Sequence, residues 1–364
     1  MKINFILPGI SLKNNISGGA KVIYQYSNYL SEKNNDVYIY YDLLDGENKK
    51  GIPNSIMRII KKIYLKFNKN YPNWFNINKN VQQRVCNINN KTIRNADVVI
   101  ASAYTTIGKI NKLLESKGKK VYFVQDFEHW NGVTDDEIYD SYKLNYEKIT
   151  VAKWLKKIID KYSKKPCTVI LNGIDEKIFK INIPIENREK YTIAYLYSDD
   201  PRKGCKYGLD IITHLIRDYP NLKINMFGYP NKPEGLPSNI IYTKNATEEQ
   251  VSNILNNSAI YMCTSLEEGF GLPGLEAMSC GCVLVSTATK GVYEYANKNV
   301  ALLSKVKDIE SMKKNICFLL DNDSKRIELA HNGNEFVQDD KLSNSCEKFE
   351  ITLKNILLNN EKEK

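Results

Sequence analysis

A chain of 364 residues is longer than one ordinary compact domain, so two domains are expected. Hydrophobic residues make up 42% of the chain, which supplies enough apolar material for real cores. No window approaches the roughly 20 apolar residues of a membrane-spanning helix, and the eight cysteines form no CxxC pair. The sequence therefore predicts neither a transmembrane segment nor a zinc knuckle or CxxC redox motif, and we expect a reducing, cytoplasmic location.

The net charge of +10 is unevenly distributed along the chain. Residues 1–167 contain 28 Lys+Arg and 15 Asp+Glu, whereas residues 168–364 contain 24 and 27. A basic half beside a mildly acidic half indicates that the first half faces an anionic partner, either a membrane or nucleic acid.

Short apolar runs alternate with longer amphipathic stretches from the start of the chain. The first half has predicted strands at 2–7, 37–41, 97–102, 120–125 and 168–171, with helices at 19–32 and 106–116. The run at 2–7 is interrupted by Pro8 and Gly9, which favours a buried strand over a signal peptide.

Within the basic half, residues 55–70 place isoleucines on one helical face and Arg58, Lys61, Lys62 and Lys66 on the rest. This pattern is typical of a helix in an anionic membrane interface, with an ordinary surface helix as the equal alternative. A peripheral membrane contact, or an acceptor-binding role for these four residues, follows from the first interpretation.

The second half repeats the alternation of strands and helices. Strands are predicted at 192–197, 223–227, 240–242, 259–263 and 283–286, helices at 206–218, 247–256 and 273–280, and further helices from about 308 onward. Such alternation predicts α/β architecture with two doubly wound, parallel-sheet, Rossmann-like domains facing across a cleft. Ligands of these sheets bind at the carboxyl ends of the strands.

The polar stretch at 176–190 contains Pro184 and is predicted to separate the two domains. The first domain is then 1–175, and the second is 191–340. Residues 341–364 are predicted as a C-terminal helix that packs back on the first domain and ends in a frayed tail.

A strand–loop–helix segment around Glu268 carries the strongest chemical signal. Gly269, Phe270, Gly271 and Leu272 follow Glu268 and lead into a helix with Pro273 in its first turn. Free N–H groups at such a helix start make a diphosphate site. Glu276, one turn into the helix, is placed to accept from a ribose diol, and Glu268 from sugar hydroxyls.

This segment resembles the E-x7-E motif of retaining glycosyltransferases of the GT-B fold, in the large family numbered four, with Glu268 and Glu276 as its two acids. The order of several weaker motifs extends the resemblance along nearly the whole chain. These are Gly18-Gly19 near the donor phosphates, Asn172-Gly173-Ile174-Asp175 before the interdomain crossing, Lys203-Gly204 at the diphosphate, and Gly291 with Glu294 in the nucleotide pocket.

Two positions depart from that family's common pattern. An arginine usually stands about five positions before the lysine, where this chain has Ser198, and Arg202 is the candidate replacement that would join Lys203 on the leaving diphosphate. A solvated turn of mixed charge is the alternative.

The strand-end histidine of many relatives is Gln125 here, followed by Asp126. This version resembles a subset that includes rhamnosyltransferases of surface polysaccharides. Asp126 is a candidate to orient donor or acceptor, and a capping role is its alternative. For Gly18-Gly19 the alternative is a plain tight turn.

The resemblance implies transfer of a hexose or deoxyhexose from a nucleotide-diphosphate sugar to a glycan or lipid-linked glycan, with retention, in cell-surface polysaccharide synthesis. It implies no metal and no cofactor beyond the nucleotide-sugar co-substrate. An epimerase or phosphorylase of the same fold is the alternative enzyme class. A nucleic-acid-binding protein is the non-enzyme alternative, and the acidic second half argues against it.

Overall fold

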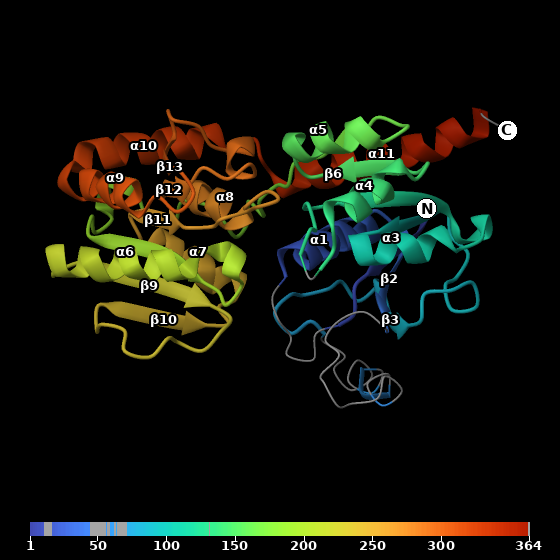
Figure 1. Ribbon diagram of the computed structural model, residues 1–364, viewed down its shortest axis with the longest axis horizontal. Coiled ribbons are helices and arrows are strands. Elements are labelled where there is room, and N and C mark those ends of the chain that lie inside the picture. Colours follow the sequence, from blue (N-terminus) through green and yellow to red (C-terminus); the bar gives the residue numbers. More distant parts are fainter. Residues whose placement is uncertain are drawn as a thin grey trace. The chain divides into compact units, whose positions relative to one another are not determined.

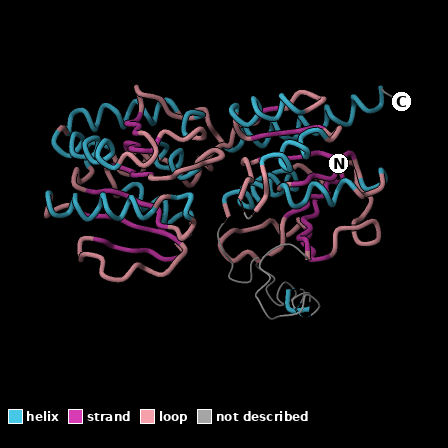
Figure 2. The backbone as a smooth tube through the Cα atoms, viewed as in Figure 1, coloured by secondary structure: helices cyan, strands magenta, loops and turns pink. Residues whose placement is uncertain are grey.

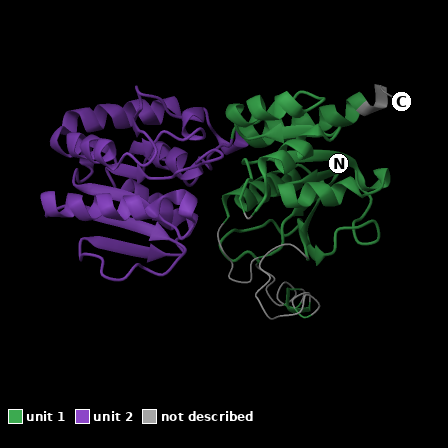
Figure 3. Cartoon of the chain, viewed as in Figure 1, with its two compact units in different colours: residues 1–171, 344–364 green, residues 172–343 purple. Residues whose placement is uncertain are grey.

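The computed structural model describes residues 1–10, 17–43, 56, 59–61, 63, 71–130 and 132–362. The chain divides into two compact units (Figure 3). Unit 1 comprises Met1–Leu171 and Asn344–Lys364, and unit 2 comprises Asn172–Ser343. In both units the helices pack around a central sheet (Figure 2).

Unit 1 contains a parallel sheet with the strand order β3-β2-β1-β4-β5-β6-β7. Its strands β2, β3 and β6 are labelled in Figure 1. Its strands are β1 (Lys2–Leu7), β2 (Asp36–Asp42), β3 (Gln82–Cys86), β4 (Val98–Ala101), β5 (Lys119–Val124), β6 (Glu147–Thr150) and β7 (Thr168–Val169). Its helices are α1 (Gly18–Glu32), α3 (Tyr104–Asn111), the short η1 (Glu115–Lys117), α4 (Asp135–Lys143), α5 (Lys153–Tyr162) and α11 (Leu342–Lys362). The central strands are apolar and buried, as expected for parallel strands covered on both faces.

Two strands of unit 1 were not predicted because their sequences are polar. β3 lies at the end of the strand order and reads Gln-Gln-Arg-Val-Cys. β6 reads Glu-Lys-Ile-Thr, and its Lys148 is nevertheless buried. The Lys148 ammonium donates to the carbonyls of Leu144 at 2.7 Å and Tyr146 at 3.1 Å. These hydrogen bonds stabilise the buried ammonium of Lys148. The charge of this residue is the reason that the sequence pattern did not predict β6.

Unit 2 repeats the topology with the parallel order β10-β9-β8-β11-β12-β13. Its strands are β8 (Thr192–Tyr197), β9 (Lys223–Gly228), β10 (Ile240–Lys244), β11 (Ile260–Cys263), β12 (Val283–Thr287) and β13 (Ala301–Ser304). Its helices are η2 (Ile185–Asn187), η3 (Pro201–Lys203), α6 (Cys205–Asp218), α7 (Glu248–Asn256), α8 (Leu272–Ser279), η4 (Val292–Glu294), α9 (Ile309–Asp321) and α10 (Asp323–Phe336).

The core of unit 2 is built from β-branched and other apolar residues of β8, β9, β11 and β12 together with one face of α6 and α9. The chain leaves β8 toward β9 on one side and reaches β11 on the other. A crevice opens at such a switch point, outside the carboxyl ends of the two strands. The loops after β8 and β11 are therefore the place to look for a ligand site.

The final helix, α11, packs on unit 1, with which residues 344–364 are grouped in Figure 3. Its Phe349 stacks on Tyr26 with ring centroids 4.4 Å apart, and it also contacts Phe5 and Phe123. Phe349 is fully buried, so the helix completes the core of unit 1.

The segment 176–190, predicted as a linker, is tied to unit 2 by a buried arginine. Arg188 is 6% exposed, and its guanidinium donates to the carbonyls of Ile183, Leu255 and Ser258. Because several carbonyls satisfy its donors, the charge is tolerated inside the unit. Burial lowers the pKa of Arg188, and the neighbouring cysteines partly oppose that shift.

Candidate functional site

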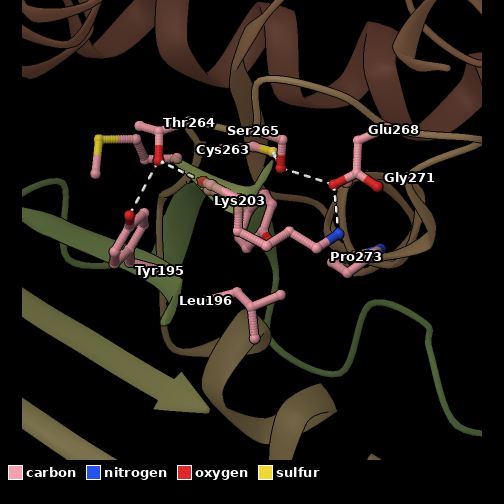
Figure 4. Close-up of a pocket in the computed structure, with 12 residues that line it drawn as sticks. Tyr195, Leu196, Lys203, Cys263, Thr264, Ser265, Glu268, Gly271 and Pro273 are labelled. Atoms are coloured by element: carbon pink, nitrogen blue, oxygen red, sulfur yellow. Dashed lines mark hydrogen bonds and ion pairs between the residues drawn. The ribbon is translucent and has the colours of Figure 1, made fainter. Parts of the chain in front are cut away.

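The candidate site lies at the switch point of unit 2, where the loops after β8 and β11 meet. η3, with Lys203 as its last residue, follows β8, and the loop that contains Glu268 follows β11. A pocket in this region is lined by Tyr195, Lys203, Thr264, Ser265, Glu268 and Gly274, among others (Figure 4). The structure thus brings the predicted Lys203 and Glu268 together.

Hydrogen bonds fix the loop after β11 against the loop after β8. The Leu266 amide donates to the Arg202 carbonyl at 2.6 Å, and Thr264 Oγ1 donates to the Lys203 carbonyl at 3.2 Å. Gly204, with φ of +61°, passes so close that a Cβ there would stand 2.2 Å from the Thr264 carbonyl oxygen. Only a glycine fits this crossing, which explains the Lys203-Gly204 pair.

Lys203 and Glu268 form an ion pair inside the pocket. Lys203 Nζ donates to Glu268 Oε1 at 2.6 Å, and Ser265 Oγ donates to the same oxygen at 2.7 Å (Figure 4). The two charged side chains are 26% and 12% exposed. Burial acts to lower the pKa of Lys203, but the charge and hydrogen bond of Glu268 outweigh it, so the pKa is raised and the ammonium stays protonated.

The N-terminus of α8 forms one wall of the pocket. Its N-cap is Gly271, in the left-handed region with φ of +99°, and Pro273 follows in the first turn. The Tyr295 hydroxyl packs against this turn, since a Cβ on Gly274 would stand 2.3 Å from it. Pro273 has no N–H, and the Gly274 amide donates to the Gly271 carbonyl at 3.1 Å, so this wall offers an anion the Leu272 amide and the positive dipole end of the helix.

Glu276, the second acid predicted for the site, lies one turn into α8 and is 7% exposed. The late loop that contains Gly291 lies against the backbone of the Glu268 loop, and neither Gly291 nor Glu294 is among the residues that line the pocket. A Cβ on Gly291 would stand 2.7 Å from the carbonyl oxygens of Glu268 and Phe270, and η4, which ends at Glu294, follows directly. Phe270 also packs on Tyr295, with ring centroids 5.4 Å apart.

The Arg202 guanidinium is already paired with a carboxylate of its own turn. Its guanidinium pairs with Asp200 at 2.6 Å, and the Asp200 carboxylate also caps the Arg202 amide at 2.9 Å. Burial acts to raise the pKa of Asp200, but the bonds and charge of Arg202 outweigh it and lower the pKa. An arginine held by its own turn is a weaker candidate for diphosphate than Lys203.

The predicted site residues Gly18, Gly19 and Asp126 belong to unit 1. Gly19 lies in the first turn of α1 beside Gln125, whose Nε2 would be 3.3 Å from a Cβ on that glycine. Asp126 Oδ1 accepts from the Phe127 amide at 2.9 Å, in the turn that follows β5. Gln125 thus lies beside the glycine loop, and Asp126 makes a local turn contact.

Most of the predicted basic helix at 55–70 falls outside the described residues, including Arg58, Lys62 and Lys66. Lys61 is described and is 4% exposed, so its side chain does not lie on the exposed basic face predicted for it. Four apolar side chains of this segment are exposed instead: Ile56, Ile59, Ile60 and Ile63.

Within the described ranges, no group of three or more His, Cys, Asp or Glu side chains is placed to hold a metal ion. No helix in the same part of the chain is both long and apolar enough to cross a membrane.

Sequence reasoning missed several residues of the pocket, among them Ser265, Thr264 and Tyr195. The Thr264 hydroxyl is 3.0 Å from the Tyr195 hydroxyl and binds the Lys203 carbonyl, so it joins the two loops. Polar residues at the carboxyl end of a buried strand were a usable signal for Thr264 and Ser265. Tyr195 carried no such signal, because a tyrosine within an apolar strand is typical of a buried core residue.

The segment that carries this pocket also has a recognisable sequence pattern. Residues 176–336 match the family model described as Glycosyl transferases group 1. The matched region contains Lys203, Glu268 and Glu276, and it covers most of unit 2.

The curated relatives of the chain are also glycosyltransferases. An uncharacterized glycosyltransferase of Methanocaldococcus jannaschii is 24% identical over 197 residues, which are 52% of this chain and 53% of the relative. The N,N'-diacetylbacillosaminyl-diphospho-undecaprenol alpha-1,3-N-acetylgalactosaminyltransferase of Campylobacter jejuni is 31% identical over 185 residues, 46% and 48% of the two chains. The chain thus spans about half the length of these relatives.

Several solved structures match nearly the whole chain in fold. Anabaena HepE, solved in complex with UDP-glucose, matches with a TM-score of 0.73 at 14% identity and covers 98% of this chain and 100% of its own. Sucrose-phosphate synthase from Thermosynechococcus elongatus matches with a TM-score of 0.69 at 14% identity, covering 98% and 99%. With the two parallel sheets, these neighbours confirm the predicted GT-B fold class.

Proposed function

We propose that this protein is a glycosyltransferase that takes a sugar from a nucleotide-diphosphate donor bound in unit 2. The observation that carries the proposal is the pocket that joins Lys203, Glu268 and the N-terminus of α8 at the switch point of the sheet. A cation and a helix N-terminus suit a diphosphate, and the flanking carboxylates suit hydroxyl groups. The pocket lies inside the segment that matches the glycosyl transferases group 1 model.

The donor's parts have separate partners in this proposal. The diphosphate lies against Lys203 and the amides of Gly269–Leu272, with Arg202 as a second cation. Glu268 accepts from sugar hydroxyls, and Glu276, buried in α8, accepts from the ribose diol. Glu294 lies in the late loop of the nucleotide pocket.

The transfer itself is proposed to retain the configuration of the sugar. The bond from the sugar C1 to the diphosphate oxygen breaks, and a bond from C1 to the acceptor oxygen forms on the same face. The acceptor proton passes to the departing diphosphate oxygen. The protein then needs no nucleophile of its own, and its task is to stabilise the charge that develops on the leaving group.

The acceptor is proposed to be a glycan or lipid-linked glycan of a surface polysaccharide that is bound by the basic unit 1. Gln125 and Asp126, at the end of β5, are the proposed orienting groups there. The Campylobacter jejuni relative supports a lipid-linked acceptor, because its name refers to a diphospho-undecaprenol carrier. We further propose that the reaction requires neither metal nor cofactor and that nucleic acid is not a partner.

The decisive experiment is a donor screen. Uridine, guanosine, adenosine and deoxythymidine diphosphates and their nucleotide sugars are tested for a rise in melting temperature of the full chain, with and without EDTA. The proposal requires stabilisation by one base series and slow hydrolysis or transfer of the matching nucleotide sugar. If none of the four series binds, the proposal is wrong. Loss of activity in the presence of EDTA would refute only the proposal that the reaction needs no metal.

A peripheral membrane location is a separate proposal that rests on the exposed isoleucines at 56, 59, 60 and 63. Flotation with vesicles of anionic lipid tests it. The variant Lys62→Glu/Lys66→Glu should float less than the wild type, whereas unchanged flotation would refute the electrostatic contact.

A further inference from the structure

We infer that Glu268 is a built-in counterion that competes with diphosphate for Lys203, so that the site favours a sugar-bearing nucleotide over the bare nucleoside diphosphate. The inference rests on the proposed function and deepens it, because it concerns how the same pocket distinguishes its substrate from its product.

The starting point is that the cation of the pocket is already paired. Lys203 Nζ lies 2.6 Å from Glu268 Oε1, and both side chains are largely shielded from water. Two opposite charges in such a place stabilise one another more than an exposed pair does. An anion that approaches Lys203 must therefore replace a carboxylate that already occupies the position.

The Glu268 carboxylate is held in the pocket by a second residue, even when Lys203 moves away from it. Ser265 Oγ donates to the same Oε1 at 2.7 Å, and Ser265 is 2% exposed with its own carbonyl held by the Thr287 hydroxyl. Glu268 therefore stays at the pocket when Lys203 turns toward a diphosphate. Its negative charge then stands near the phosphates without the ammonium, which opposes binding.

A sugar on the diphosphate changes this balance. Its hydroxyl groups donate hydrogen bonds to Glu268 and so replace the ammonium that the carboxylate has lost. The bare nucleoside diphosphate offers no such donor at that position. After transfer the sugar is gone, Glu268 pairs again with Lys203, and the diphosphate is released more readily, a step that limits turnover in many enzymes.

The test compares two glutamates that differ by one position in sequence. Glu268→Gln removes the counterion, and Glu267→Gln removes the same charge from the exposed neighbour. Calorimetric titration measures the affinity of the full-length variants for uridine, guanosine, adenosine and deoxythymidine diphosphate and for the corresponding nucleotide sugars.

In the base series that binds the wild type, we expect Glu268→Gln to bind the nucleoside diphosphate about three- to tenfold more tightly. The same variant should bind the nucleotide sugar no more tightly than the wild type. Glu267→Gln should change both affinities by less than about twofold, because its charge is screened by solvent.

Unchanged or weaker diphosphate binding by Glu268→Gln would overturn the inference, as would an equal gain in Glu267→Gln. Glu268→Ala provides a second variant if the glutamine variant does not fold, and the same gain is expected. If the wild type binds neither the diphosphate nor the nucleotide sugar of any series, the proposed function fails and this inference falls with it. If the wild type binds and neither Glu268 variant gains, only the inference fails.

Discussion

Ser265 Oγ donates a hydrogen bond to Glu268 Oε1, and the same oxygen accepts a hydrogen bond from the Lys203 ammonium. Ser265 is buried, and its carbonyl is held by the Thr287 hydroxyl, so the donor is fixed in place. Two donors on one oxygen set the plane of the carboxylate. We expect its other oxygen to accept from the ligand, which makes Ser265 a positioning residue rather than a catalytic one.

Removal of that hydroxyl is the first prediction. Ser265→Ala should reduce kcat about tenfold with a smaller change in KM for the donor, because Glu268 is less well oriented when the reaction occurs. Ser265→Thr keeps the hydroxyl and should restore part of the rate. A purely structural role would give alanine and threonine variants that lose activity only in proportion to their folded fraction, measured by circular dichroism.

The second prediction concerns Glu276, which is 7% exposed inside α8. Glu276→Ala should weaken donor binding about ten- to a hundredfold, because it removes charge-assisted hydrogen bonds to the ribose. Calorimetric titration with nucleotide sugar measures the loss. A variant with unchanged donor affinity and turnover would show that the ribose assignment is wrong. The loss of affinity should be smaller for a donor that contains deoxyribose, since deoxyribose has one hydroxyl fewer to bind Glu276.

The third prediction compares two helical glycines. A Cβ on Gly274 would stand 2.3 Å from the hydroxyl of the buried Tyr295, whereas a Cβ on Gly108 in α3 would meet nothing within 4 Å. Gly274→Ala should therefore lower the free energy of unfolding by about 1–3 kcal/mol through overpacking. Gly108→Ala should be neutral or stabilising by up to about 1 kcal/mol.

Thermal and urea unfolding measure both variants, and Tyr295→Phe provides the internal check. In the Gly274→Ala background the removal of the hydroxyl should recover part of the lost stability. Equal effects of the two alanine substitutions on stability would show that the contact with Tyr295 does not destabilise an alanine at position 274.

The fourth prediction is a pH dependence that arises from Lys148 in β6. Burial lowers the pKa of Lys148 from 10.5 to about 8. Between those two values the unfolded chain binds more protons than the folded one, so this residue makes stability rise with pH from about 8 toward 10.5. Below pH 8 both states are protonated and its contribution is constant.

The measurement is the free energy of unfolding of the wild type minus that of Lys148→Met at several pH values. The difference should grow in favour of the wild type by about 1–3 kcal/mol between pH 8 and 10. Subtraction removes the contribution of the tyrosines, which ionise in the same range. A difference that stays flat across that range would contradict the lowered pKa.

Much of unit 2 could be predicted from the sequence because its signals are local. The strand at 192–197, the loop with Glu268 and the start of α8 are fixed by apolar runs, glycines and a proline within a few positions. The same local pattern could not reveal β6, where Lys148 is buried through carbonyls that only the folded chain supplies.

By itself, the sequence determined the alternation of strands and helices, hence two parallel sheets, and the order of acids and glycines around Glu268. These features depend on neighbours in the chain, so periodicity and spacing record them. Only the tertiary structure decided that Lys203, 65 positions before Glu268, lies 2.6 Å from it, and that Ser265 shares the same oxygen. Such contacts depend on strand order, because β8 and β11 become neighbours only when the sheet forms.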